Sequence, residues 1–253
     1  MPAEERSIRV EGVVLRHSEF GEADRLLTVF TRERGKLKVV AKGVRKMRSR
    51  KAGHLEPFMR TSMQLAYGRD LWVVTQVETV DAFQPIREDL LRTGYASYVI
   101  ELLDRFTFEE GAYQSLYQLL IDTLHRLSEQ TDGFLTVRYY EIRLLDYIGY
   151  RPELFQCVDC REEIKPQDQF FSALQGGVLC PRCGTHSSDA LPISLQALKY
   201  LRHFQRSTFK EANRAELNPS ARKELEYLMQ RYISFLLERN LNSPAFIREV
   251  RKD

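Results

Sequence analysis

Two C-x-x-C pairs organise the second half of the chain: Cys157-Val158-Asp159-Cys160 and Cys180-Pro181-Arg182-Cys183, with nineteen residues between them. They contain all four cysteines of the sequence. Each pair places two thiolates on one tight turn, and two such turns facing each other surround a zinc ion tetrahedrally. Because four thiolates leave no coordination position for water, we predict one structural zinc ion with these ligands: Cys157, Cys160, Cys180 and Cys183.

Other uses of these cysteines stay open. Two disulfides require an oxidising compartment, a redox C-x-x-C needs only one pair in a βαβ context, and an iron–sulfur cluster also takes four thiolates. His186 lies three residues beyond Cys183 and is a substitute ligand, although four thiolates are already present. Pro181 and Gly184 are expected to help the second turn, since proline fixes φ and glycine permits positive φ.

Length and composition bound the kind of protein. The chain has 253 residues, enough for one large or two small domains. The sequence contains no run of eighteen apolar residues that would predict a membrane span, and residues 1–6 lack the apolar segment of a signal peptide. We therefore expect a cytoplasmic protein without a membrane partner.

Charge is distributed unevenly along the chain. Residues 1–80 carry 16 Lys and Arg against 10 Asp and Glu, whereas the rest carries 22 against 25. This asymmetry predicts that an anionic partner meets the amino-terminal part.

The first eighty residues show the alternation of apolar and polar side chains that is typical of strands. Short apolar runs are separated by turn residues such as Arg34-Gly35 and Gly68-Arg69-Asp70. We predict strands over residues 8–15, 25–31, 36–42, 58–67 and 71–80. Five short strands without a long helix indicate a small antiparallel barrel, and a five-stranded barrel of the OB type is the leading prediction.

Residues 34–51, which contain the third strand and its flanking residues, carry nine basic side chains and no acidic one. Leu37, Val39 and Ala41 are expected to point inward, which places the lysines of this strand on the outer face. A row of cations that continues into a basic loop is typical of a surface that binds nucleic-acid phosphates. We therefore predict DNA contacts from Arg34, Lys36, Lys38, Lys42, Arg45, Lys46, Arg48, Arg50 and Lys51.

This basic stretch also permits two alternative interpretations. Lysines on an exposed strand discourage edge-to-edge aggregation, but this role accounts for one or two of them and not for a row of cations without a compensating carboxylate. Binding to an anionic lipid surface is the second alternative, although no apolar helical face accompanies the charge.

The barrel segment also contains five aromatic residues that are candidates for base stacking: Phe20, Phe30, Phe58, Tyr67 and Trp72. In so small a barrel, however, most aromatic side chains are expected to belong to the core.

Helical periodicity begins after residue 82. Apolar stripes predict a bundle of helices over residues 93–106, 113–127 and 134–148. Beyond the cysteines, a helix over residues 195–204 and another with Asn218 as its N-cap complete this part, and the tail from Arg248 is expected to fray. The predicted architecture is α+β with two domains: a barrel at 1–81, and a helical domain at 82–253 that carries the zinc ribbon or knuckle at 155–190.

The motifs of common enzymes are absent. The sequence has no phosphate-binding loop, dinucleotide-binding fingerprint, H-E-x-x-H or G-x-S-x-G, and its carboxylates are scattered. We therefore predict a protein that binds rather than catalyses, with no catalytic residue. A nuclease or nucleotidyltransferase subunit is the less favoured hypothesis.

Two runs, GKLKVVAKGVRK at 35–46 and GYRPEL at 149–154, resemble the bacterial recombination mediator family RecO. EGVVLR at 11–16 and REDL at 87–90 are also similar to the pattern of that family, so the resemblance covers nearly the whole chain. Members of the family differ in whether the cysteines are kept. The resemblance implies an OB-like barrel with a helical body, and a non-enzymatic role in the RecF pathway of DNA repair and homologous recombination.

As the resemblance implies, such a protein binds single- and double-stranded DNA and anneals complementary strands. With RecR it helps to load RecA onto gaps that single-strand-binding protein (SSB) coats, and its helical body binds the acidic, apolar C-terminal tail of SSB. It is expected in the cytoplasm, at the nucleoid. From the residues alone, a structural RNA-binding module with an OB barrel and a zinc ribbon, without a role in recombination, is the alternative.

Overall fold

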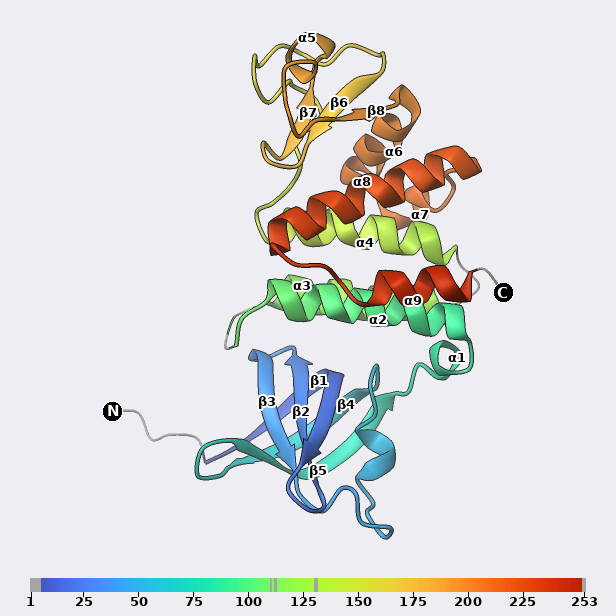
Figure 1. Ribbon diagram of the computed structural model, residues 1–253. Helices are drawn as coiled ribbons and strands as arrows, with labels where there is room; N and C mark the ends of the chain where they lie inside the picture. The colour runs from blue at the N-terminus through green and yellow to red at the C-terminus, as the bar shows by residue number, and fades with distance from the viewer. Residues whose placement is uncertain (1–5, 110, 112, 130–131, 252–253) are drawn as a thin grey trace. The chain divides into compact units, whose positions relative to one another are not determined.

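The computed structural model describes residues 6–109, 111, 113–129 and 132–251 (Figure 1). It divides into two compact units, one of Met1–Glu129 with Ala245–Asp253 and one of Gln130–Pro244. The predicted boundary after residue 81 is the end of the barrel rather than of a compact unit, and the division into two domains at that point stays a prediction. No helix among the described residues combines the length and the apolar character needed to cross a bilayer.

Five strands close into a barrel in the first unit. They are β1 (Ser7–Phe20), β2 (Asp24–Thr31), β3 (Gly35–Ala41), β4 (Arg60–Tyr67) and β5 (Trp72–Asp81). Around the barrel the order is β1-β2-β3-β5-β4, and β3 pairs with β5 in parallel whereas the other neighbours are antiparallel. This order is that of an OB-type barrel, which confirms the predicted fold.

The barrel core follows the predicted alternation of β3. Leu37, Val39 and Ala41 are buried inside, so residues 36, 38 and 40 belong to the outer face. The same core contains apolar residues from the other strands and from the segment between β3 and β4: Ile8, Val10, Val14, Leu27, Val29, Val44, Leu55, Met63, Leu65 and Val74. The segment between β3 and β4 therefore belongs to the barrel at its two ends, through Val44 and Leu55, and a short 3-10 helix lies at Ala52–His54.

Helices α2 (Leu90–Phe106) and α3 (Gln114–Ser128) pack in the same unit as the barrel, after the single turn α1 (Gln84–Arg87). The ring of Phe30, on the outer face of β2, stacks on Tyr113 with a centroid distance of 5.9 Å. The hydroxyl of Tyr117 donates to Oε1 of Glu11 at 3.0 Å, and Arg60 donates to the same oxygen. These contacts cover part of the outer barrel surface.

The chain end is more ordered than predicted. Helix α9 (Ser243–Val250) includes Arg248, so the prediction of a frayed tail is wrong for residues 248–251, whereas 252–253 lie outside the described residues. The reason is packing within the first unit. A Cβ on Gly94 of α2 would lie 3.1 Å from Ile247, and the guanidinium of Arg251 donates to the Tyr95 hydroxyl at 3.0 Å.

Three helices and one short turn form the body of the second unit. They are α4 (Gly133–Tyr147), α6 (Leu195–Arg206), α7 (Phe209–Ala212) and α8 (Pro219–Leu237). The side chains of Asp132, Ser194 and Asn218 accept hydrogen bonds from backbone N–H groups in the first turns of α4, α6 and α8, respectively. Such caps fix where a helix begins, and Asn218 is the cap that the sequence predicts.

A small sheet completes the second unit. Its strands are β6 (Gln169–Ser172), β7 (Gly177–Leu179) and β8 (Leu191–Ile193), in the order β7-β6-β8, and the turn α5 (Pro181–Gly184) follows β7. Phe171 of β6 makes an edge contact with Tyr232 of α8 at a centroid distance of 5.3 Å. The sheet is therefore attached to the helical body and carries the cysteine pairs beside it, as the prediction of a ribbon within a helical domain requires.

Candidate nucleic-acid surface and metal centre

The nine cations predicted to contact DNA, here called the basic strip, fall into two parts. The strand half consists of Arg34, which directly precedes β3, and of Lys36 and Lys38 on β3. The loop half lies in the segment after β3 and consists of Lys42, Arg45, Lys46, Arg48, Arg50 and Lys51. Because β3 alternates, its lysines leave the barrel on the outer side, where α2 and the residues after it also lie.

Carboxylates distant in the sequence neutralise the strand half. Lys36 Nζ lies 2.6 Å from the carbonyl oxygen and 3.1 Å from the carboxylate of Asp104, and its side chain is only 12% exposed. Lys38 Nζ lies 2.5 Å from Oε1 of Glu109, in an exposed pair. The prediction of cations without a compensating carboxylate is therefore wrong for Lys36 and Lys38, because the acidic partners follow these lysines by some seventy residues.

Asp104 is the best-defined of these partners. Burial raises the pKa of Asp104, but hydrogen bonds from Lys36 and Arg16 outweigh burial and leave the pKa below its usual value. The ion pair with Lys36 thus has a structural part in holding α2 against β3. Whether Lys36 also contacts DNA stays a prediction.

The loop half contains two cations with partners on the barrel and four that are exposed. Arg45 pairs with Glu19 at 3.0 Å, and Lys51 Nζ donates to the carbonyl of Val74 at 3.2 Å. The other four cations are exposed and make no ion pair with any described residue: Lys42, Lys46, Arg48 and Arg50. These four cations are therefore available to bind phosphates, which would release the counterions of the nucleic acid.

The aromatic candidates separate by burial. Phe30 and Phe58 are buried, whereas Phe20 and Tyr67 are about half-exposed. Tyr67 and Trp72 meet edge to face with centroids 5.0 Å apart, at the two ends of the predicted turn at residues 68–70. Trp72 is also the residue of β5 that pairs with Val39 of β3. An aromatic pair therefore lies next to the strand that carries the basic strip, as a stacking platform for bases requires.

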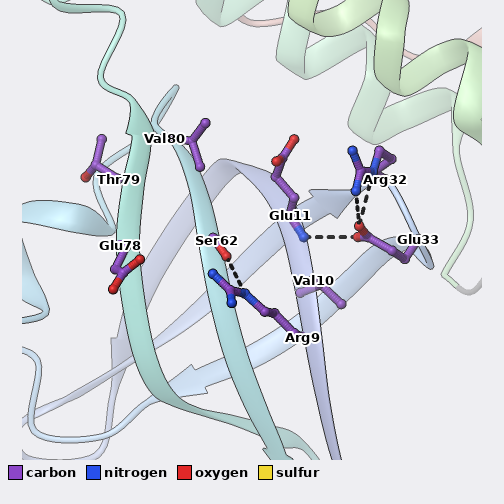
Figure 2. Close-up of a pocket in the computed structure, with 9 residues that line it drawn as sticks. All are labelled: Arg9, Val10, Glu11, Arg32, Glu33, Ser62, Glu78, Thr79 and Val80. Carbon is purple, nitrogen blue, oxygen red and sulfur yellow. Dashed lines mark hydrogen bonds and ion pairs between the residues drawn. The ribbon is translucent and has the colours of Figure 1, made fainter.

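A hollow on another part of the barrel carries both signs of charge. Figure 2 shows that Arg9 reaches Ser62, and that Glu33 accepts from the backbone of Glu11 and pairs with Arg32. Burial raises the pKa of Glu11, but hydrogen bonds from Arg60 and Tyr117 outweigh it and lower the pKa. Because Arg32 is paired with Glu33 and two further glutamates, Glu11 and Glu78, line this hollow, it does not extend the predicted phosphate-binding surface.

The four cysteines meet in the second unit. Their sulfur atoms all lie within 4.8 Å of one another, and Sγ of Cys160 lies 3.8 Å from Sγ of Cys180. A tetrahedral ion with metal–sulfur bonds of about 2.3 Å requires sulfur–sulfur distances of about 3.8 Å. Within the described part of the chain, this is the one cluster of three or more His, Cys, Asp or Glu side chains that could hold a metal ion. The geometry thus fits a four-thiolate metal site.

Each pair of cysteines lies on a tight turn. In the first turn Arg161, at φ +62°, donates its N–H to the carbonyl of Cys157, and in the second Gly184 donates to Cys180. Gly184 is not at positive φ, so its predicted role is wrong. Glycine is needed there because a Cβ would lie 2.4 Å from the ring of Phe170.

The thiols are free, with no disulfide among them. Burial raises the pKa of Cys157, but backbone N–H groups, of which that of Cys180 lies 3.3 Å from the sulfur, outweigh it and lower the pKa to about 7. His186 is outside the sulfur cluster, and its Nδ1 lies 2.8 Å from the carbonyl oxygen of Arg182. Backbone donors that stabilise a thiolate are what a metal ligand needs.

Comparison with known proteins identifies the family. The model of the Recombination protein O N terminal matches residues 6–83, and that of the Recombination protein O C terminal matches residues 87–245. The chain belongs to the RecO family. A DNA repair protein RecO from Roseiflexus sp. is 41% identical over 98% of this chain and 87% of its own length. Proteins of the same name from Dehalococcoides mccartyi and Symbiobacterium thermophilum are each 36% identical, over 91% and 96% of this chain and 91% and 97% of their own lengths.

The predicted resemblance to RecO is therefore confirmed, and membership of this family supports a role in DNA repair and recombination. The GYRPEL run of this RecO chain lies where α4 leads into the cysteine ribbon. Gly149 is at φ +84°, the carbonyl of Pro152 accepts from Gln205, and Glu153 accepts from the backbone N–H groups of Phe155 and Gln156. This run turns the chain out of the helix and fixes the start of the ribbon.

Proposed function

We propose that the protein is a non-enzymatic recombination mediator that binds single- and double-stranded DNA and anneals complementary strands. In this role it works with RecR to promote RecA loading onto gaps coated by SSB. The observation that carries the proposal is the loop half of the basic strip, an anchored set of cations of which four are exposed, on an OB-type barrel. Because the partner is chromosomal DNA, we expect the protein to act in the cytoplasm, at the nucleoid.

Salt dependence tests the DNA surface. If about six of the nine cations contact phosphates, a plot of log K against log salt should have a slope of about −4 for single strands. A four-site variant that replaces Lys38, Lys42, Arg45 and Lys46 by Glu should abolish binding in fluorescence anisotropy. The matched control replaces four exposed lysines of the second unit by Glu: Lys165, Lys199, Lys210 and Lys223. Equal loss in both variants, or a slope near zero for the wild type, contradicts the proposal.

Competition between single-stranded DNA and RNA of one sequence separates the mediator from a structural RNA-binding module. A mediator should prefer the DNA or bind both with little sequence preference, since its cations contact phosphates rather than base edges. A strong preference for RNA favours the module instead. Annealing of complementary strands by the wild type, and its loss in the four-site variant of the basic strip, supports the first function.

Recruitment is a separate part of the proposal. We propose that the helical body binds the acidic, apolar C-terminal tail of SSB, and that RecR is a second protein partner. A labelled tail peptide should bind the wild type, whereas a peptide of the same composition in scrambled order should not. The four-site variant of the basic strip should bind the tail peptide normally, because the peptide does not use the DNA surface.

The cysteine site is proposed to hold one structural zinc ion. A closed set of four thiolates leaves no position for substrate, so the ion stabilises the ribbon rather than taking part in a reaction. Metal analysis of reduced protein should find about one zinc per chain. Cys160→Ser should lose the metal and several kcal/mol of stability, whereas His186→Ala should keep both. Iron with visible absorbance, or no metal at all, contradicts the assignment.

A further inference from the structure

The segment that carries the loop half of the basic strip projects from the barrel and is anchored to it at both ends. Val44, at its beginning, is part of the barrel core. The backbone N–H of Arg45 donates to the carbonyl of Ala23 at 3.0 Å, and Lys51, at its end, donates to the carbonyl of Val74. Residues 46–50 between these anchors therefore have a fixed base on the barrel.

A β-turn forms the tip of this projection. The carbonyl of Lys46 accepts from the N–H of Ser49 at 2.9 Å, which makes Met47 and Arg48 the two central residues of the turn. Met47 is completely exposed, with a relative accessibility of 104%. The other methionines among the described residues, Met59, Met63 and Met229, are all buried. Met47 thus contributes nothing to the packing of the barrel and is fully accessible from outside.

The surroundings of Met47 indicate the chemistry of that partner. Lys46 and Arg48 flank it in sequence, Lys42 and Arg50 lie on the same segment, and all four are exposed cations without an ion pair to described residues. A partner must therefore offer anions beside an apolar slot. Duplex DNA does so, because phosphates line the groove and an apolar side chain can enter between two base pairs. Methionine, being unbranched and flexible, fits a narrow slot of this kind.

We propose that Met47 is a wedge that enters the base stack of duplex DNA beside a single-strand junction, while the flanking cations hold the phosphates. Unstacking is easiest at a junction, where the last base pair has a stacked neighbour on one side only. The inference rests on the proposed DNA-binding function and adds a contact for double strands and junctions. A single apolar residue on a turn favours DNA over an anionic lipid surface, which takes a whole apolar helical face.

The test uses 2-aminopurine, whose fluorescence rises on unstacking, as the first base of the duplex beside a single-strand tail. The wild type and Met47→Leu should raise the fluorescence at saturation, and Met47→Ala should not. Met47→Ala should also bind the junction about three- to tenfold more weakly but bind single strands unchanged, since it keeps every cation. Leu90→Ala is the matched control, because Leu90 is an exposed apolar residue of the same unit away from the strip.

The outcomes separate the wedge from the proposed function. If the wild type binds single strands but does not unstack the junction base, or if Met47→Ala unstacks it equally, the wedge is wrong and DNA binding stands. If the wild type binds no DNA, the proposed function itself fails. Binding of anionic vesicles by the wild type that Met47→Ala loses, without an effect at the junction, assigns the turn to lipid and overturns the wedge.

Discussion

The strand half and the loop half of the basic strip have a similar density of basic residues but different surroundings. In the strand half, Lys36 and Lys38 face Asp104 and Glu109, and Lys36 is almost buried. In the loop half, four cations are exposed and unpaired within the described chain, on a segment held by its backbone. A cation that already has a carboxylate partner contributes less to binding an anion, because the new contact replaces an old one. Position in the fold, and not charge density in the sequence, therefore decides which cations are available.

The largest expected effect comes from the loop half. Replacing Lys42, Lys46 and Arg48 together by Ala should weaken binding to single-stranded DNA on the order of 100-fold at low salt and reduce the salt slope by about 2. Fluorescence anisotropy over a series of salt concentrations measures both. The same triple change at Lys165, Lys199 and Lys210 should have little effect, and a similar loss there would remove the distinction between the loop half and general charge.

Lys36 is expected to contribute more to the stability of the fold than to the affinity for DNA. Lys36→Met leaves the half-buried Asp104 with Arg16 as its remaining side-chain donor, which should cost about 1–3 kcal/mol of unfolding free energy. Lys38→Met, at an exposed pair, should cost less than about 1 kcal/mol. Urea unfolding gives both values. If Lys36→Met unfolds like the wild type but loses DNA binding, the division between the two halves is reversed.

Glu109 is expected to compete with DNA for Lys38. Glu109→Gln removes the charge but keeps the shape, so Lys38 becomes available and affinity for single strands should rise about two- to fivefold at low salt. Glu78→Gln is the control, since it makes the same charge change on β5 of the same unit. An equal rise in both variants attributes the gain to net charge alone.

The smallest effect is the pH dependence of the pairing at Asp104. A carboxylate whose folded pKa is lowered stabilises the fold above its unfolded pKa, near the usual value of 3.8, and this stabilisation disappears as the pH falls through the lower folded pKa. The stability of the wild type should therefore fall more steeply in acid than that of Asp104→Asn. Parallel curves of unfolding free energy against pH would show that the pair with Lys36 contributes nothing.

Much of the architecture could be predicted from local patterns. Alternation along β3 identifies Leu37, Val39 and Ala41 as core, and the spacing of the cysteines predicts the sulfur cluster that the fold assembles. Both signals are short in range, because side chains alternate along a strand and a C-x-x-C turn brings its own two sulfurs together. Stacking candidates were harder to predict, since burial of Phe30 depends on Tyr113, more than eighty residues away.

The sequence alone determined the OB-type barrel, the helical body, the four-thiolate cluster and the family, because periodicity and motif spacing are local properties that the chain carries wherever it folds. Tertiary structure alone decided that Asp104 and Glu109 meet β3, that α9 packs on α2, and that Met47 projects from the barrel. Those contacts join residues far apart in sequence, where no pattern of neighbours records which surfaces will meet.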